Sequence, residues 1–155
     1  MKKIALFLGF SVVAALISLT AFRKEEAFRP YETLSEYGLF TGELKNLEPA
    51  ADVLPYDLNT PLFSDYAYKL RFVKIPEGKA ATYSAGEAFG FPEGTVIAKT
   101  FYYPDDFRKP GKKRRLLETR ILYKQAEGWA AYPYVWNEEQ TEARYDVAGQ
   151  IKPVE

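Results

Sequence analysis

Carboxylates are the abundant side chains in this sequence that could carry acid–base chemistry, because its 155 residues include neither histidine nor cysteine. Glycoside hydrolysis, for example, needs two carboxyl groups that face each other across a sugar, roughly 5–10 Å apart. The adjacent pairs Asp105/Asp106 and Glu138/Glu139 are neighbours in the sequence, and this alone does not make them face each other. We therefore expect that the protein is not an enzyme.

Oxygen-bearing side chains in one loop raise the question of a calcium site. Asp57, Asn59 and Asp65 carry the hard oxygen ligands that Ca²⁺ prefers. Their spacing lacks the central glycine and the closing glutamate of an EF-hand loop. Asp and Asn side chains more often hydrogen-bond to the backbone of turns, so we expect turn and cap hydrogen bonds here and no metal site.

Haem chemistry is limited by composition. Covalent attachment of a c-type haem needs a C-x-x-C-H motif, and histidine or methionine are the usual axial ligands. The chain has no cysteine and no histidine, and its single methionine is Met1. We expect no cofactor in this chain.

Two further groups of side chains could bind a ligand or a partner. The aromatic set Trp129, Tyr132, Tyr134 and Trp136 could stack against a carbohydrate or another small ligand, although core packing is the more common use of such residues. The second group is the basic run of residues 108–115, which contains Arg108, Lys109, Lys112, Lys113, Arg114 and Arg115. Pro110 and Gly111 at its centre favour a solvated hairpin loop, with docking of an acidic partner as the alternative. The chain has 21 basic and 21 acidic residues, which does not indicate nucleic-acid binding.

The N-terminus has the pattern of an export signal. Lys2 and Lys3 precede an apolar run that extends to Leu19, and Ala21 offers a small residue for cleavage. We expect a signal peptide over residues 1–21 and a periplasmic or secreted protein. The alternative is an uncleaved membrane anchor over residues 4–21, which is the only way in which we expect contact with a membrane.

Strand patterns dominate the rest of the chain. Residues 22–31 are expected to be a linker, residues 33–40 a helical turn or two, and the stretch up to Ser64 an ordered surface loop. Strands are expected at 68–75, 79–84, 95–103, 115–124, 128–136 and 142–149. The prediction is an all-β fold, a small β-sandwich or barrel-like domain over residues 32–155.

Alternation within two of these strands predicts which side chains share a face. Lys69 and Arg71 are expected to point away from Tyr68, Leu70 and Phe72. In the strand at 115–124, Leu116, Glu118 and Arg120 are expected on one face, with Glu118 and Arg120 in a cross-strand ion pair or as buried anchors. Pro133 has no N–H group, so the strand at 128–136 is expected to be an edge strand or to be bulged there.

Five segments occur in a recognisable order: LSEYGLF (34–40), PYDLNTPLFSDYAYKLRFVKIPEG (55–78), FPEGTVIAKTFYYP (91–104), LLETRIL (116–122) and GWAAYPYVWNEEQTEA (128–143). Together they resemble the N-terminal region of a family of exported bacterial dihaem c-type cytochromes, over nearly all of residues 34–149. The resemblance implies an all-β module that precedes the haem-bearing part of a longer protein. In that family the C-x-x-C-H motifs follow this region, and this chain ends at Glu155 before any occurs, so no haem ligand can be assigned here.

The resemblance sets the functional expectation. We expect an exported, non-catalytic β-domain that is accessory to electron transfer, with a c-type cytochrome or haem domain as its partner. The chain would then be a truncated member of the family, one product of a split gene, or a module that works beside a separate cytochrome. The alternative from a different class is a carbohydrate- or small-ligand-binding module that uses surface aromatic residues.

Overall fold

The structure is a computed structural model that describes residues 28–111 and 113–151. The predicted signal peptide, residues 1–21, and the first part of the predicted linker lie outside the described residues. Within the described part of the chain, no helix is long and apolar enough to cross a lipid bilayer.

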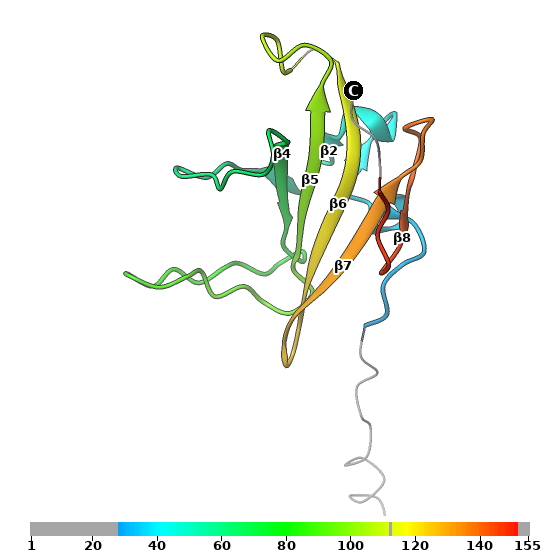
Figure 1. The fold of residues 1–155 in the computed structure, drawn as a ribbon. Helices are drawn as coiled ribbons and strands as arrows, with labels where there is room; N and C mark the ends of the chain where they lie inside the picture. Colours follow the sequence, from blue (N-terminus) through cyan, green and yellow to red (C-terminus); the bar gives the residue numbers. More distant parts are fainter. Residues whose placement is uncertain (1–27, 112, 152–155) are drawn as a thin grey trace, which may run out of the picture.

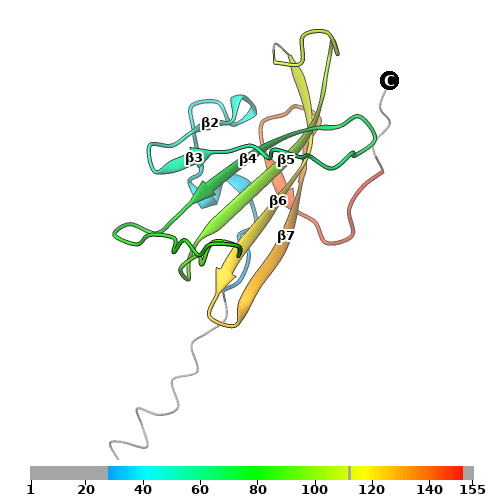
Figure 2. The same cartoon turned by 90° about the vertical axis from the view of Figure 1, so that its left-hand side faces the viewer.

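The described chain forms two antiparallel sheets and two short 3-10 helices, so the prediction of an all-β fold is confirmed. In chain order the elements are η1 (Leu34–Tyr37), β1 (Phe40–Thr41), η2 (Leu44–Asn46), β2 (Glu48–Pro49), β3 (Val53–Pro55), β4 (Tyr68–Lys74), β5 (Val96–Pro104), β6 (Arg114–Gln125), β7 (Gly128–Trp136) and β8 (Ala143–Tyr145). The larger sheet has the order β3-β4-β5-β6-β7-β8, and the smaller sheet pairs β1 with β2 (Figures 1 and 2). Each strand therefore pairs with its neighbour in the chain, as in a meander.

The long strands β4 to β7 divide the larger sheet into two faces. In β5 the buried residues Val96, Ala98, Thr100 and Tyr102 alternate with half-buried residues on the other side. We call the face that carries these buried residues the inner face and the opposite one the outer face. The strands predicted at 115–124 and 128–136 correspond to β6 and β7, which form a hairpin with Gln125 paired to Gly128 across a tight turn.

A β-bulge in β6 changes which residues reach the core. Tyr102 pairs with Leu116 and Phe101 pairs with Glu118, so Leu117 is an extra residue with no partner in β5. Leu116 is consequently buried on the inner face, with 1% exposure. The prediction that Leu116 shares a face with Glu118 is wrong, because strict alternation fails across a bulge.

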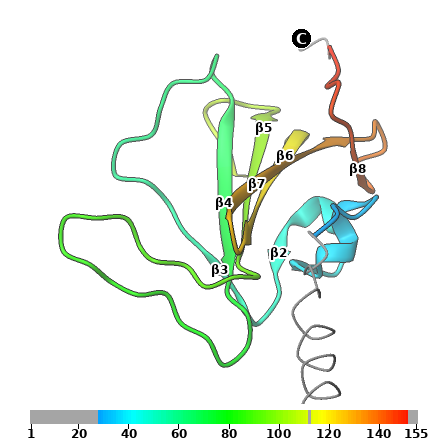
Figure 3. The ribbon, with the colours of Figure 1, turned by 90° about the horizontal axis from the view of Figure 1, so that it is seen from below.

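The N-terminal part of the described chain forms a layer over the inner face. Its buried residues pack against those of the sheet in one core: Leu34, Tyr37, Leu39 and Leu47 from the layer, and Val53, Phe72, Val96, Ala98, Tyr102, Leu116, Ile121, Tyr134, Trp136 and Ala143 from the sheet. Figure 3 shows this layer on one side of the sheet. Phe28 also stacks on Tyr123 with ring centroids 3.7 Å apart, so the end of the predicted linker packs against the domain.

The local predictions for this layer were right in one place and wrong in another. The helical turn is confirmed as η1, which Thr33 precedes and Gly38 ends with a left-handed φ of 58°. The stretch predicted to be a surface loop contains β1, η2, β2 and β3. Strands of two or three residues show no periodicity, and Pro55 lies in β3 at the edge of the sheet, where a missing N–H is tolerated.

Three other strand predictions hold only in part. The segment at 79–84 makes a single bridge, between Thr82 and Gly90, and the last strand is limited to β8. Strand β8 pairs with β7 only from Tyr134 onward, so Pro133 is not part of that ladder. The Pro133 carbonyl accepts a hydrogen bond from the Asp146 amide. Pro133 therefore lies where β7 is an edge strand.

Candidate anion-binding groove

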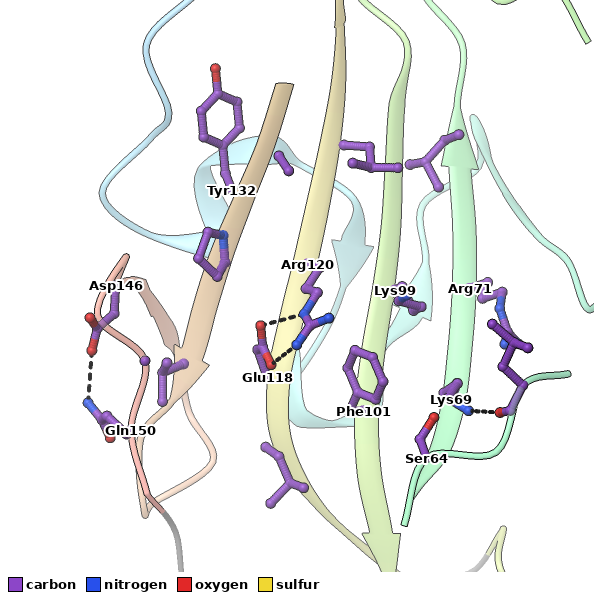
Figure 4. A pocket seen from close by; sticks show the side chains of 18 of the residues that line it. Ser64, Lys69, Arg71, Lys99, Phe101, Glu118, Arg120, Tyr132, Asp146 and Gln150 are labelled. Carbon is purple, nitrogen blue, oxygen red and sulfur yellow. Dashed lines mark hydrogen bonds and ion pairs between the residues drawn. The ribbon is translucent and has the colours of Figure 1, made fainter. Parts of the chain in front are cut away.

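A groove of about 1120 Å³ runs across the outer face of the larger sheet. Its floor is formed by side chains of β4, β5, β6 and β7, and its two walls are residues 56–64 and residues 146–150 (Figure 4). The floor residues alternate along each strand with the core residues of the inner face, so the same strands build the core and the groove.

Three cations form a row across the centre of this floor. Arg71 of β4 pairs in register with Lys99 of β5, and Lys99 pairs with Arg120 of β6. We call these three residues the cationic row. Like charges placed directly opposite each other on neighbouring strands are destabilising. A fold that keeps three of them side by side therefore needs counter-charges, or a ligand that supplies one.

The two outer members of the cationic row have counter-charges within the chain. The Arg71 guanidinium is only 6% exposed, and it lies 3.0 Å from the Asp57 carboxylate at the start of the first wall. Arg120 donates two hydrogen bonds to the Glu118 carboxylate, from Nε at 2.7 Å and from an Nη at 3.1 Å. Neither of these carboxylates pairs with Lys99, the central member of the cationic row.

Lys99 makes no ion pair within the described residues. Its ammonium lies 5.1 Å from the centre of the Phe101 ring on the same strand. Burial lowers the pKa of Lys99, and the positive charges of Arg120 and Arg71 lower it further. The surroundings of Lys99 therefore destabilise its charged form. A bound anion would stabilise that charge.

The charges around the floor are unequal. The four cations of the groove are Lys69, Arg71, Lys99 and Arg120, and the three nearby carboxylates are Asp57, Glu118 and Asp146. Lys69 donates to the backbone carbonyl of Leu62 at 2.6 Å, and Asp146 accepts hydrogen bonds from the Ala148 amide and from Gln150. The groove therefore carries a positive excess, centred on Lys99.

Apolar side chains lie beside these charges. Ile97, Leu122 and Ala131 follow one another in register across β5, β6 and β7, next to the cationic row, and we call them the apolar row. The walls add apolar side chains that are largely exposed, at 83% for Leu62, 72% for Phe63 and 74% for Val147. The site therefore combines Lys99, which makes no ion pair within the described residues, with apolar surface that is accessible to a ligand.

Of the three residues considered for calcium, Asp57 and Asp65 make contacts within the protein. The Asp57 carboxylate accepts hydrogen bonds from Arg71 and from the Leu58 amide, and the Asp65 carbonyl accepts one from the Tyr103 hydroxyl at 2.7 Å. No group of three or more histidine, cysteine or acidic residues in the described part of the chain is placed to hold a metal ion. The expected turn hydrogen bond is present at Asp57.

One acidic residue of each pair considered for catalysis contacts an arginine. Asp106 accepts hydrogen bonds from the backbone and side chain of Arg108, and Glu138 lies 2.9 Å from Arg115. The predicted ion pair of Glu118 with Arg120 exists, but it forms between neighbours on one face of β6, and the cross-strand form is wrong.

The four aromatic residues do not form one surface. Tyr134 and Trp136 are buried at 0% and 1% exposure, so the core interpretation is confirmed for them. Tyr132 is half-buried and its ring lies 6.0 Å from that of Phe28. Trp129 is 42% exposed and contacts Phe91 instead.

Arg108 and Lys109 of the basic run lie in the loop between β5 and β6, as predicted, whereas Arg114 and Arg115 are the first residues of β6 (Figure 1). Arg114 donates to the Asn46 carbonyl at 2.5 Å and lies over the Tyr102 ring, and Arg115 pairs with Glu138. Lys112 lies outside the described residues. Docking of an acidic partner by this loop stays a prediction, and the arginines near its end also bind other parts of the domain.

Sequence reasoning missed the cationic row. It placed Lys69 and Arg71 on a polar face, although Arg71 is buried. A usable signal was present in the sequence, because Lys99 is the only charged residue in the strand predicted at 95–103. A search of family models, curated proteins and solved structures finds no match to this chain.

Proposed function

We propose that this protein is a non-catalytic binding module whose outer sheet face holds an anionic group at the cationic row. The observation that supports the proposal is the position of Lys99, half-buried between Arg71 and Arg120 without an ion pair in the described structure. Charge-assisted hydrogen bonds from lysine and arginine to carboxylate or phosphate are among the stronger polar contacts in proteins. An anion placed on Lys99 would offset the repulsion along the row.

Chemical-shift mapping by NMR, with acetate and inorganic phosphate as probes at low ionic strength, tests this function. The largest shifts are expected at Lys99, Phe101 and Arg120. Lys99→Gln should abolish them, whereas Lys109→Gln removes the same charge from the loop between β5 and β6 and should leave them unchanged. Equal shifts in both variants, or shifts centred on residues 108–115, would show that anions bind only as a diffuse response to positive charge.

The resemblance to the dihaem cytochrome family supplies a setting for this module. We propose that the protein is exported and that it assists electron transfer by positioning a haem-bearing partner, because it has no cysteine or histidine with which to hold a c-type haem itself. In this setting the anionic group would be supplied by the partner or by a ligand that regulates the contact. The test is co-purification with a c-type cytochrome from the periplasmic fraction and its loss in the Lys99→Gln variant.

A second candidate, carbohydrate binding, is favoured by one observation. Tyr83, Phe89 and Trp129 expose 75%, 57% and 42% of their surface, and Phe91 lies between the rings of Phe89 and Trp129. Exposed aromatic rings of this kind can stack on sugars. Since Trp136 is buried, quenching of tryptophan fluorescence by a sugar would report on Trp129, and Trp129→Ala should remove the response.

A further inference from the structure

We propose that the ligand of the groove is an amphipathic carboxylate, with its carboxyl group on Lys99 and its aliphatic chain over the apolar row. This inference rests on the proposed function and adds the class of ligand to it. It is drawn from three features of the groove: a cation at the centre of the cationic row that makes no ion pair within the described residues, the apolar residues next to it, and the spacing of the charges along the row.

The head group follows from the pairing of the cations. Arg71 and Arg120 each have a carboxylate partner within 3.0 Å, which leaves one cation of the row without one. Neighbouring strands lie about 4.8 Å apart, so a group placed on Lys99 also lies near both arginines. A single carboxylate, with two oxygens, can accept hydrogen bonds from Lys99 and from one arginine at the same time.

The apolar part of the ligand follows from the surface that a small anion would leave uncovered. Leu122 is 37% exposed on the floor, and Leu62 and Val147 are exposed on the two walls of the same groove. Acetate or phosphate on Lys99 would leave this surface in water. An aliphatic chain that leaves the carboxyl group towards Ile97 and Leu122 would cover it, and each buried methylene contributes up to about fourfold in affinity.

The spacing of the charges disfavours an acidic peptide as the occupant. Side chains on one face of an extended peptide repeat every two residues, or about 6.6 Å, whereas the cations of the row follow the strand spacing of about 4.8 Å. Successive acidic residues therefore do not match the row. The arginines are also already paired, so a second or third acidic group would find no free counter-charge there.

Calorimetry with acetate, octanoate, 1-octanol and an acidic peptide, Gly-Glu-Gly-Glu-Gly, tests the inference. We expect octanoate to bind roughly 10–100-fold more tightly than acetate, because part of its chain is buried. We expect 1-octanol to bind more weakly than octanoate because it lacks the charge. We expect the peptide to bind more weakly because the spacing of its acidic side chains does not match the cationic row. Octanoate binding no tighter than acetate, or either of the other two probes binding as tightly as octanoate, would overturn the inference.

Two variants separate the roles of charge and chain. Leu122→Ser should weaken octanoate binding about tenfold and leave acetate unchanged, since only the chain contacts the apolar row. The control Leu54→Ser alters an exposed leucine of β3 outside the groove and should change neither. Lys99→Gln should weaken both ligands. If acetate still maps to Lys99 but Leu122→Ser leaves octanoate unchanged, the proposed anion site stands and the inference about its ligand falls. If neither ligand binds, both fall.

Discussion

Lys99 lies directly opposite Arg120 in the ladder between β5 and β6, and both cations contact the ring of Phe101, at 5.1 Å and 4.9 Å from its centre. The negative face of an aromatic ring attracts cations, so Phe101 offsets part of their mutual repulsion. It cannot supply a full counter-charge.

Lys99→Met should stabilise the protein. The substitution removes a like-charge contact with Arg71 and Arg120, while the thioether can still pack against Phe101. The expected gain in the free energy of unfolding is about 0.2–1 kcal/mol, measured by urea unfolding at neutral pH. Lys109→Met, which removes a charge from the loop between β5 and β6, is the control and should change stability little. A loss of stability in Lys99→Met would show that the repulsion is already compensated.

Anion binding should weaken as the pH rises towards 10.5. The charged groups around Lys99 are Lys69 and Arg71 on β4, Glu118 and Arg120 on β6, Asp57 before β4 and Asp146 after β8. Because burial and the two arginines lower the pKa of Lys99 below its ordinary value of 10.5, its charge is lost at a lower pH than that of an exposed lysine. Octanoate affinity measured from pH 7 upward should therefore fall. In Lys99→Arg, which keeps its charge, the affinity should stay nearly constant, and an equal fall in both proteins would contradict the assignment.

Two buried tyrosines should make the protein sensitive to alkali. The hydroxyl groups of Tyr37 and Tyr134 lie 2.9 Å apart, and Tyr134 donates to the Tyr31 carbonyl at 2.8 Å. Burial raises the pKa of Tyr37 to about 12 and also raises that of Tyr134. Raised pKa values in the folded state mean that stability is full below about pH 10, where tyrosine ionises in the unfolded chain, and that it is lost as the pH rises towards 12.

Phenylalanine variants test this tyrosine pair. Tyr37→Phe and Tyr134→Phe should each lower the free energy of unfolding by about 0.5–1.5 kcal/mol at pH 7. The double variant should cost less than their sum, since the shared hydrogen bond is lost only once. Between pH 10 and 12 the double variant should lose less stability than the unmodified protein. Additive costs would mean that the hydroxyl groups do not interact.

The Thr119 hydroxyl should be needed for a stable core. It lies 2.7 Å from the Thr100 hydroxyl and accepts a hydrogen bond from the Trp136 indole at 3.0 Å, all at buried positions. Thr119→Val keeps the shape but removes both contacts, and should cost about 1–3 kcal/mol. Thr119→Ser keeps the hydroxyl and loses only a methyl group, at about 0.5–1.5 kcal/mol. Thermal unfolding of both variants measures these losses. A serine variant less stable than the valine variant would contradict the role of the hydroxyl group.

Much of the sheet could be predicted from local patterns. The alternation at 68–75 predicted the strand that is β4, because side chains in a half-buried strand alternate between core and solvent. Prediction failed where this alternation was absent or interrupted. The two residues of β1 are too few to show a period, and the bulge at Leu117 shifts every residue before it to the other face.

The candidate site was less accessible to prediction than the fold. Lys69, Arg71, Glu118 and Arg120 were noticed, but as polar residues of separate strands. Their grouping depends on register, since Arg71 meets Lys99 only when β4 and β5 pair at one particular offset, and a slip of one residue would send Lys99 to the inner face. Such offsets are fixed by packing over the whole sheet and by the bulge.

By itself the sequence determined the chemistry that is possible, because composition is independent of folding. Without cysteine or histidine the chain cannot hold a c-type haem through the usual groups, and its alternating strands require a sheet with one buried face. Only the tertiary structure decided that Arg71, Lys99 and Arg120 lie side by side with the apolar row next to them. These residues come from three strands separated by many residues of chain, and their proximity exists only once hydrogen bonding across the whole sheet has set the register.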